Sequence, residues 1–197
     1  ARARTSTLVF AELVASADGR SVANELVTAL IDAQSGARAS VDAIAELLQA
    51  RCPSFCSADD VRRLKAAECI RNAAQTDALL RAERTLAHDA SDDRRRAIDA
   101  DLQASLSLLL ASAADIALPR LAQTAATYNE LGFARGTIAL GLACARASDP
   151  DDLAAVFRAD GYPVEASPRR THYDTRRAMY ALVLEALLKV DAAAADA

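Results

Sequence analysis

The feature that most constrains this fold is a helical run without any charge, from Gly136 to Ala145. A helix that is apolar on every side lies either at the centre of a soluble core or in a membrane. The run is far shorter than the ~20 residues that a bilayer span needs, and the sequence shows no signal or transit peptide. We therefore expect Phe133–Ser148 to form the inner helix of a stack.

Turn signals on both sides of this run predict where its neighbours begin and end. Pro119 suits the first turn of a helix, and Gly132 suits the left-handed residue that follows its last turn. In the same way, Asp149 before Pro150 predicts the start of another helix, and Gly161 predicts its end. The stretch therefore predicts three consecutive helices.

The rest of the chain also has helical spacing. Aromatic residues make up only 4% and Trp is absent, so the core must consist of Leu, Ala, Val and Ile, which favour helices here. Further helices are predicted at Thr5–Ala15, Ser21–Ala33, Ser40–Cys52, Ser57–Gln75, Thr76–His88, Ser91–Ala113 and Thr171–Val190. The first of these segments also fits a strand, which its Thr, Val and Phe residues suit. The pattern predicts an all-α chain of about nine antiparallel helices, either a bundle or an irregular α-solenoid segment. Helix pairs recur about every forty residues, which is the spacing of irregular helical repeats and favours the α-solenoid.

Small residues in the inner helix predict that neighbouring helices approach it closely, because glycine inside a helix usually has a packing reason. These residues are Gly136, Ala139, Gly141 and Ala143. The last predicted helix is apolar on more than one face. We expect it to pack backwards onto Phe133–Ser148 and to offer its other face to a following repeat.

The ends of the sequence suggest a piece of a longer chain. It begins ARARTS without an initiator Met and ends DAAAADA. In a solenoid each repeat contacts only its neighbours, and natural ends need polar faces that this sequence lacks. We expect residues 1–197 to form a single helical fragment that self-associates through its exposed ends.

Charge and cysteine content exclude several classes of protein. A net charge of −4 and a pI near 5.2 argue against direct binding of nucleic acid. The cysteines lie in helical sequence and are expected to be reduced, intracellular thiols: Cys52, Cys56, Cys69 and Cys144. The most basic positions form either a solvated helix face or a site for an acidic partner or phosphate: Arg169, Arg170, Arg176 and Arg177.

One acidic motif keeps an enzymatic alternative open. Asp149-x-Asp151-Asp152 matches the acid motif of some all-α terpene cyclases, in which a carboxylic acid protonates an alkene. The simpler interpretation is a helix cap with acids at the positive end of the helix dipole. Carboxylates that converge in an apolar cavity would favour an all-α enzyme or small-molecule binder, whereas carboxylates in solvent would favour a scaffold.

Other candidate groups have weaker support. Asp89, Asp92 and Asp93 could be a magnesium cluster, but arginines follow at once and favour a solvated helix start. Cys52 and Cys56 with His88 and His172 lack the spacing of a structural zinc site. Cys144 lies in the most apolar helix, where the thiolate that a Cys/His nucleophilic pair needs is disfavoured. We predict no catalytic, cofactor-binding or metal site and no cofactor.

Two stretches resemble a known family. They are RCPSFCSADDVRRLKAAECIRNA, from Arg51, and YNELGFARGTIALGLACARASDPDDLAAVFRADGYPVEASPRRTHYDTRRAMYALVLEAL, from Tyr128. Both resemble the large inner-ring scaffold nucleoporins, the hundred-and-fifty-five-kilodalton class of the nuclear pore. Members have a CP-x-x-(C/Y) turn, an aromatic-x-x-Gly-(T/V)-(I/V)-x-L helix, then Asp-Pro and a helix to a Gly, in this order. Residues Ala1–Gln34 match little of the family.

The resemblance implies a structural protein without catalytic activity, in which this α-solenoid segment lies C-terminal to a β-propeller. It implies scaffold and linker nucleoporins as partners, and no membrane insertion by this segment. It also implies a location in the nuclear pore complex, at the nuclear envelope of the nucleus, and a role in protein and mRNA transport and in envelope assembly.

Overall fold

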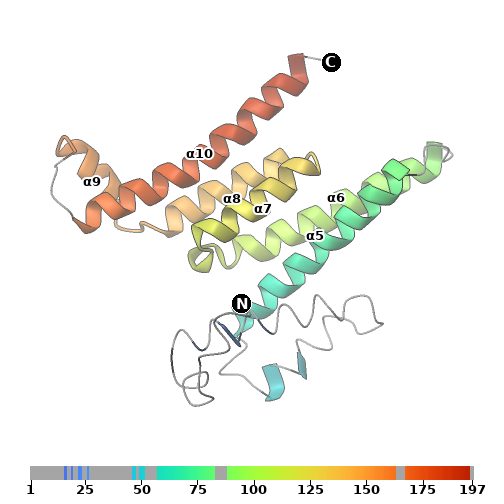
Figure 1. The fold of residues 1–197 in the computed structure, drawn as a ribbon, viewed down its shortest axis with the longest axis horizontal. Helices are drawn as coiled ribbons and strands as arrows, with labels where there is room; N and C mark the ends of the chain where they lie inside the picture. Colours follow the sequence, from blue (N-terminus) through green and yellow to red (C-terminus); the bar gives the residue numbers. More distant parts are fainter. Residues whose placement is uncertain are drawn as a thin grey trace. The chain divides into compact units, whose positions relative to one another are not determined.

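The computed structural model describes residues 57–82, 88–162 and 167–195, together with a few positions before residue 57. The chain divides into two compact units, Ala1–Glu68 and Cys69–Ala197. Within the described residues, all the regular structure is helical, which confirms the predicted all-α class (Figure 1). None of the described helices combines enough length with enough apolar character to cross a membrane.

The first unit is described only in part. The predicted helix Thr5–Ala15 lies outside the described residues, and Ser21–Ala33 and Ser40–Cys52 are described at a few positions, which are helical. The predicted total of about nine helices therefore stays a prediction. Helix α5 (Ala58–Ala82) starts as predicted. Ser57 Oγ accepts the Asp60 N–H at 3.1 Å, and the Asp60 carboxylate accepts the Ser57 N–H at 2.9 Å, a reciprocal capping box.

The second unit is built around one helix. Its elements after α5 are α6 (His88–Leu110), the short 3₁₀ helix η1 (Ala113–Asp115), α7 (Leu118–Glu130), α8 (Ala134–Ala147), α9 (Leu153–Ala159) and α10 (Pro168–Ala195). Helix α8 packs against α6, η1, α7 and α10, and none of residues 136–145 is exposed. The uncharged run therefore is the inner helix, as predicted.

Helix α10 runs antiparallel to α8 and approaches it closely. A Cβ added to Gly141 of α8 would lie only 2.6 Å from Cγ2 of Val183, so glycine is what permits this approach. At the other end of the contact, Nδ1 of His172 donates to the carbonyl of Ser148 at 3.0 Å. The predicted packing of the last helix onto Phe133–Ser148 is confirmed.

Helices α7 and α9 both end at a glycine in the left-handed conformation. The φ angles of Gly132 and Gly161 are 73° and 76°. A residue that has a Cβ adopts such angles only at a cost in free energy. The glycine N–H groups donate to the carbonyls of Asn129 and Arg158, at 3.3 and 3.2 Å. Both predicted helix ends are confirmed.

Each of these glycines lies between two aromatic residues, in the sequences YNELGF and FRADGY. The N–H of Phe133 donates to the carbonyl of Tyr128 at 2.7 Å, and that of Tyr162 to the carbonyl of Phe157 at 3.3 Å. The rings of each pair meet edge to face, with centroids 5.1 and 5.8 Å apart. Both turns are Schellman motifs closed by an apolar contact.

Several predicted boundaries are wrong. The chain does not break between Gln75 and Thr76, because α5 is continuous from Ala58 to Ala82. No glycine or proline interrupts this sequence, and Arg81 forms an ion pair with Asp77 one turn earlier, at 2.8 Å. The apolar spacing that suggested two helices, one to Gln75 and one from Thr76, fits a single continuous helix equally well.

Helix α6 also departs from its prediction. It begins at His88 rather than Ser91, since acidic residues stabilise a first turn as well as a cap and locate a helix start only to within a turn. It ends at Leu110 rather than Ala113. The hydroxyl of Ser112 then bonds to a carbonyl of the last turn, and η1 follows.

Helix α10 is longer than predicted. It begins at Pro168 rather than Thr171, because Ser167 accepts the N–H of Arg170 at 3.4 Å and proline suits the first helical position. It continues past Val190 into an alanine run, which has high helix propensity.

Candidate functional site

Asp149, in the acidic motif, joins α8 to α9. Its buried carboxylate accepts the N–H groups of Leu153 and Ala154 at 2.8 and 2.9 Å. The prediction that Asp149 caps this helix is confirmed. The predicted start is wrong, because α9 begins at Leu153 after a turn in which Asp152 has a φ of 53°.

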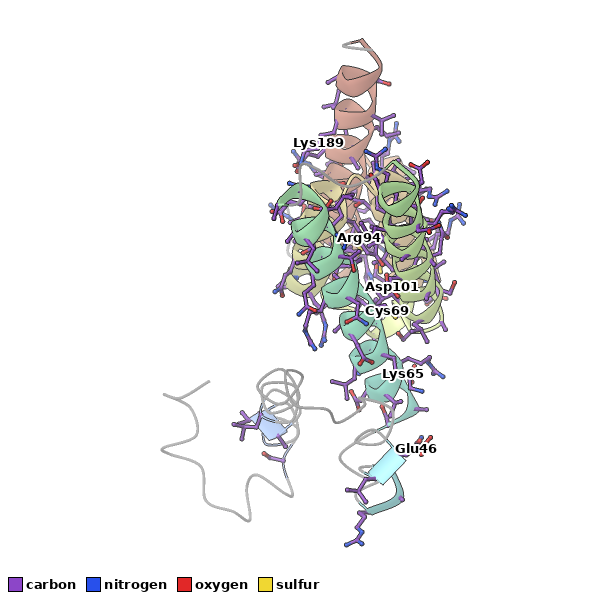
Figure 2. The ribbon with its side chains drawn as sticks, turned by 90° about the vertical axis from the view of Figure 1, so that its right-hand side faces the viewer. Glu46, Lys65, Cys69, Arg94, Asp101 and Lys189 are labelled. Carbon is purple, nitrogen blue, oxygen red and sulfur yellow. The ribbon has the colours of Figure 1, made fainter. Side chains whose placement is uncertain are left out.

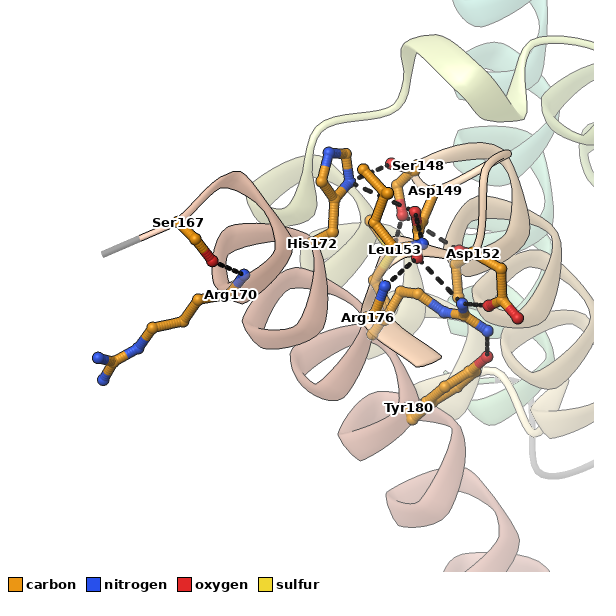
Figure 3. A network of polar contacts seen from close by, with 12 residues as sticks. Ser148, Asp149, Asp152, Leu153, Ser167, Arg170, His172, Arg176 and Tyr180 are labelled. Carbon is orange, nitrogen blue, oxygen red and sulfur yellow. Dashed lines mark hydrogen bonds and ion pairs between the residues drawn. The ribbon is translucent and has the colours of Figure 1, made fainter. Parts of the chain in front are cut away.

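Two side chains of α10 reach the same carboxylate. Nη1 of Arg176 lies 3.1 Å from Oδ2 of Asp149 and also donates to Asp152, while Nδ1 of His172 lies 3.8 Å from Oδ1 of Asp149. Figure 3 shows these groups converging on the connection between α8 and α9. The Asp149 side chain has no exposed area and Arg176 has little. The pair is therefore shielded from solvent, and losing one partner would leave the other charge uncompensated.

The pKa of Asp149 argues against acid catalysis. Burial alone raises this pKa, but hydrogen bonds from Ala154 and Leu153, with Arg176 and the nearby His172, lower it below its usual value. A general acid at neutral pH needs a raised pKa. Asp149 is thus an ionised cap, not a proton donor.

The three acids of the motif do not converge. Asp151 and Asp152 are exposed, as a scaffold predicts, whereas Asp149 is buried among hydrogen-bond donors rather than in an apolar cavity. Nothing in this geometry supports the alternative of an all-α enzyme or a small-molecule binder at this motif.

The predicted basic positions are largely neutralised. Arg176 belongs to the Asp149 cluster, so the prediction of a solvated face is wrong for it. Two others form exposed ion pairs of small energetic value: Arg169 with Asp160 at 2.9 Å, and Arg170 with Asp174 at 3.8 Å. Of the four, Arg177 alone has no ion-pair partner among the described residues.

The described cysteines have no reactive setting. Cys144 is buried in α8, and burial raises its pKa to about 11, so it is a thiol at neutral pH. Cys69 is a half-buried thiol. Cys52, Cys56 and the side chain of His88 lie outside the described residues.

No metal centre is formed by the described part of the chain. Asp93 forms an exposed ion pair with Arg96 at 2.8 Å, and the side chain of Asp89 lies outside the described residues. No group of three or more described His, Cys, Asp or Glu residues could hold an ion.

Sequence reasoning missed the partners of Asp149. His172 and Arg176 lie one turn apart on α10, so their side chains share a face of that helix. This spacing was the available signal. It did not indicate which segment the face contacts.

The Asp149 cluster therefore connects three helices and has no feature of a reactive centre. The sequence model of the family described as Non-repetitive/WGA-negative nucleoporin C-terminal matches residues 1–197. The chain belongs to this family. The resemblance inferred from the sequence is confirmed, and the chain is part of a structural component of the nuclear pore complex at the nuclear envelope.

Curated relatives carry the same family name. A probable nucleoporin of Schizosaccharomyces pombe is 30% identical over 183 residues, which cover 92% of this chain and 12% of the relative. Nucleoporin NUP170 of Chaetomium thermophilum is 29% identical and covers 93% of this chain and 12% of the relative. This nucleoporin chain thus spans 12% of the length of these relatives.

Solved structures confirm the helical architecture. The crystal structure of Chaetomium thermophilum Nup170 SOL matches with a TM-score of 0.75 at 26% identity, covering 97% of this chain and 24% of that chain. A crystal structure of a Nup170 CTD mutant from the same organism matches with a TM-score of 0.58 at 27% identity, covering 72% and 22%. The nucleoporin chain is therefore an α-solenoid segment, as predicted.

Proposed function

We propose that residues 1–197 form a single segment of a longer nucleoporin solenoid, and that this segment joins other parts of the pore scaffold without a catalytic step. Its role is to hold partner surfaces at fixed positions, in support of nucleocytoplasmic transport. The observation that carries this proposal is an exposed apolar face on α10, which we call the α10 face. It consists of Leu184, Leu187, Leu188 and Val190.

Leu184 and Leu188 of the α10 face lie away from the buried side of the helix, and Leu187 and Val190 lie at the edge of that buried side. Met179, Val183 and Ala186 of the same helix are buried, and Val183 contacts α8 at Gly141. A helix on the surface of a soluble protein usually has a polar outer face. Leu184 and Leu188 are instead 57% and 60% exposed, which is the pattern of a helix that packs on both sides.

The last turns of α10 extend beyond the other helices of the second unit, as Figure 2 shows around Lys189. From the contact between Gly141 and Val183, α10 continues for ~18 Å, whereas α8 reaches only ~10 Å in the same direction. Helix α8 therefore ends level with about Val190, and only the residues of α10 after Val190 lie beyond its reach.

We propose that the following helices of the same longer nucleoporin cover the α10 face. The curated relatives are about eight times as long as the matched region, which is 12% of their length, so they contain ample chain for such a layer. Repeats of a solenoid bury a continuous core by stacking on their neighbours. Other contacts of the segment would be with scaffold and linker nucleoporins.

The first experiment measures the mass of the chain in solution over a range of concentrations. With the α10 face uncovered, the parent should self-associate, and the double variant Leu184→Glu/Leu188→Glu should be monomeric with unchanged helix content. The control is Leu79→Glu in α5, because Leu79 is 54% exposed but lies outside the α10 face. It should self-associate like the parent. A parent that remains monomeric, with amide exchange in the last turns of α10 as slow as in α8, would contradict the proposal.

The scaffold role has its own test. Purified pore subunits are mixed one at a time with the chain, and the complexes are separated by size. At least one subunit should bind the parent, the Leu79→Glu control and the Leu184→Glu/Leu188→Glu variant with the same affinity, because the contacts with other nucleoporins are proposed to lie outside the α10 face. If no subunit binds the parent, the scaffold role of this segment is refuted.

A further inference from the structure

A groove of about 550 Å³ lies between α9 and α10, within the size range of ligand sites. Small alanine side chains of α9 line part of it, and Tyr162, Tyr173 and Tyr180 line much of the rest. Arg158 of α9 and Arg177 of α10 complete the opposite sides. None of these residues belongs to the α10 face.

The tyrosines form a surface cluster rather than a core. The ring centroids of Tyr162 and Tyr173 are 5.4 Å apart, and each ring also contacts Phe157. Tyr162 has a φ of 60°, which a residue with a side chain adopts at a cost in free energy. This backbone conformation sets the direction in which the Tyr162 side chain leaves the chain. A large ring is thereby held at the groove, half of it in contact with solvent.

The groove carries positive charge that none of the described residues neutralises through an ion pair. Among the described residues, neither Arg158 nor Arg177 has an ion-pair partner, whereas Arg176 beside them is bonded to Asp149 and Asp152. Hydrogen bonding to Tyr162 raises the pKa of Tyr173, and Arg177 and Arg158 oppose that shift. Both guanidinium groups therefore lie near enough to act on the Tyr173 hydroxyl.

From this arrangement we infer that the groove binds a short acidic peptide of a partner protein, with an apolar side chain among the tyrosines and carboxylates against Arg158 and Arg177. Tyrosine and arginine are the residues that dominate binding at protein interfaces, and arginine pairs with carboxylates through two parallel hydrogen bonds. A concave surface lined by rings fits a peptide side chain better than a flat membrane surface. The inference rests on the proposed scaffold function and adds to it a surface separate from the α10 face.

The experiment selects binders from a random nonapeptide display library on the full chain. Enriched sequences should contain Asp or Glu on either side of an apolar residue. One consensus peptide is then synthesised with a fluorescent label, and its dissociation constant is measured by anisotropy. The double variant Arg158→Glu/Arg177→Glu should weaken binding at least tenfold, and so should Tyr173→Ala.

The matched control is Arg95→Glu in α6, since Arg95 is also exposed and has no ion-pair partner among the described residues. It should change the dissociation constant less than twofold, and circular dichroism should show the same helix content in every variant. Selection of peptides without acids, or equal affinity for the parent and the double variant, would overturn the inference.

Two further measurements distinguish a peptide groove from a membrane-binding surface and from the α10 face. Sedimentation with phosphatidylserine vesicles tests the membrane surface, and vesicle binding that depends on Arg158 and Arg177 without any selected peptide would overturn the inference. The variant Leu184→Glu/Leu188→Glu should retain peptide binding. If only the Arg158→Glu/Arg177→Glu variant loses peptide binding, the inference of a peptide groove is supported. If no peptide binds the groove, the proposed role of the α10 face is still tested by its own experiment.

Discussion

The turns that end α7 and α9 have the same backbone hydrogen bonds and different surroundings. Tyr128 and Phe133 are 0% and 3% exposed, and the Tyr128 hydroxyl shares a hydrogen bond of 2.7 Å with Ser105 of α6. At the second turn Phe157 is buried but Tyr162 is 49% exposed. An aromatic–glycine–aromatic pattern therefore stops a helix by local geometry, and the packing around it decides whether the second ring joins the core or a binding groove.

The helices that precede these turns are stabilised differently. Helix α7 has 13 residues and no side-chain cap, and its buried face packs on α8. Helix α9 has only 7 residues, too few to be stable without outside contacts. Its start is fixed by the buried carboxylate of Asp149, which Arg176 holds from α10. Helix α7 and its turn thus depend mainly on apolar burial, whereas α9 and its turn depend mainly on a shielded polar cluster.

The largest difference between the turns should appear when their tyrosines are truncated. Tyr128→Ala removes a fully buried ring and its hydrogen bond with Ser105, whose hydroxyl keeps its bond to the Leu102 carbonyl, so we expect a loss of about 3 to 5 kcal/mol in the free energy of unfolding. Tyr162→Ala removes a half-exposed ring and should cost less than about 1 kcal/mol. Urea unfolding followed by circular dichroism measures both. Equal losses would show that the turns do not differ as described.

A smaller effect should distinguish the acids before α9. Asp149→Ala removes the cap and leaves Arg176 without its buried partner, so we expect a loss of about 2 kcal/mol in the free energy of unfolding. Asp151→Ala, two positions along in the same motif, removes an exposed carboxylate and should change that free energy by less than about 0.5 kcal/mol. A large loss in the control would mean that the whole motif, and not Asp149, stabilises α9.

The same pair predicts a pH dependence. Because the folded pKa of Asp149 lies below its unfolded value of about 3.9, its contribution is fully present above that unfolded value and is lost as pH falls through the folded pKa. The difference in stability between the parent and Asp149→Ala should therefore shrink as the pH is lowered from 6 toward about 2. A difference that does not change with pH would exclude an ionised Asp149 as its source.

The smallest effect should be the same at both turns. Gly132→Ala and Gly161→Ala place a Cβ on a backbone of positive φ, and at neither position does that Cβ meet an atom within 4 Å. Only the backbone strain remains, so each substitution should cost about 1 kcal/mol. The same unfolding experiment compares them. A much larger loss at Gly132 would show that its buried surroundings restrict the turn in addition to the local strain.

Local rules were enough to predict much of this fold. Some sequence signals depend only on the local chain: a glycine after a helical run, a proline in a first turn, and an uncharged stretch. The turns at Gly132 and Gly161 and the central position of α8 could therefore be predicted without knowing any contact. The resemblance to a nucleoporin family could also be recognised, because the order of its turn motifs is written along the chain.

The sequence by itself therefore determined the all-α class, the inner helix and the two glycine turns that end α7 and α9. The tertiary structure decided which residues meet. Arg176 joins Asp149 from another helix, and Tyr162 and Leu184 are exposed because no other described helix packs over them. The physical reason is that helix signals act over one or two turns. Burial, ion pairs and grooves instead arise between segments far apart in the sequence, and their separation along the chain does not give their distance in space.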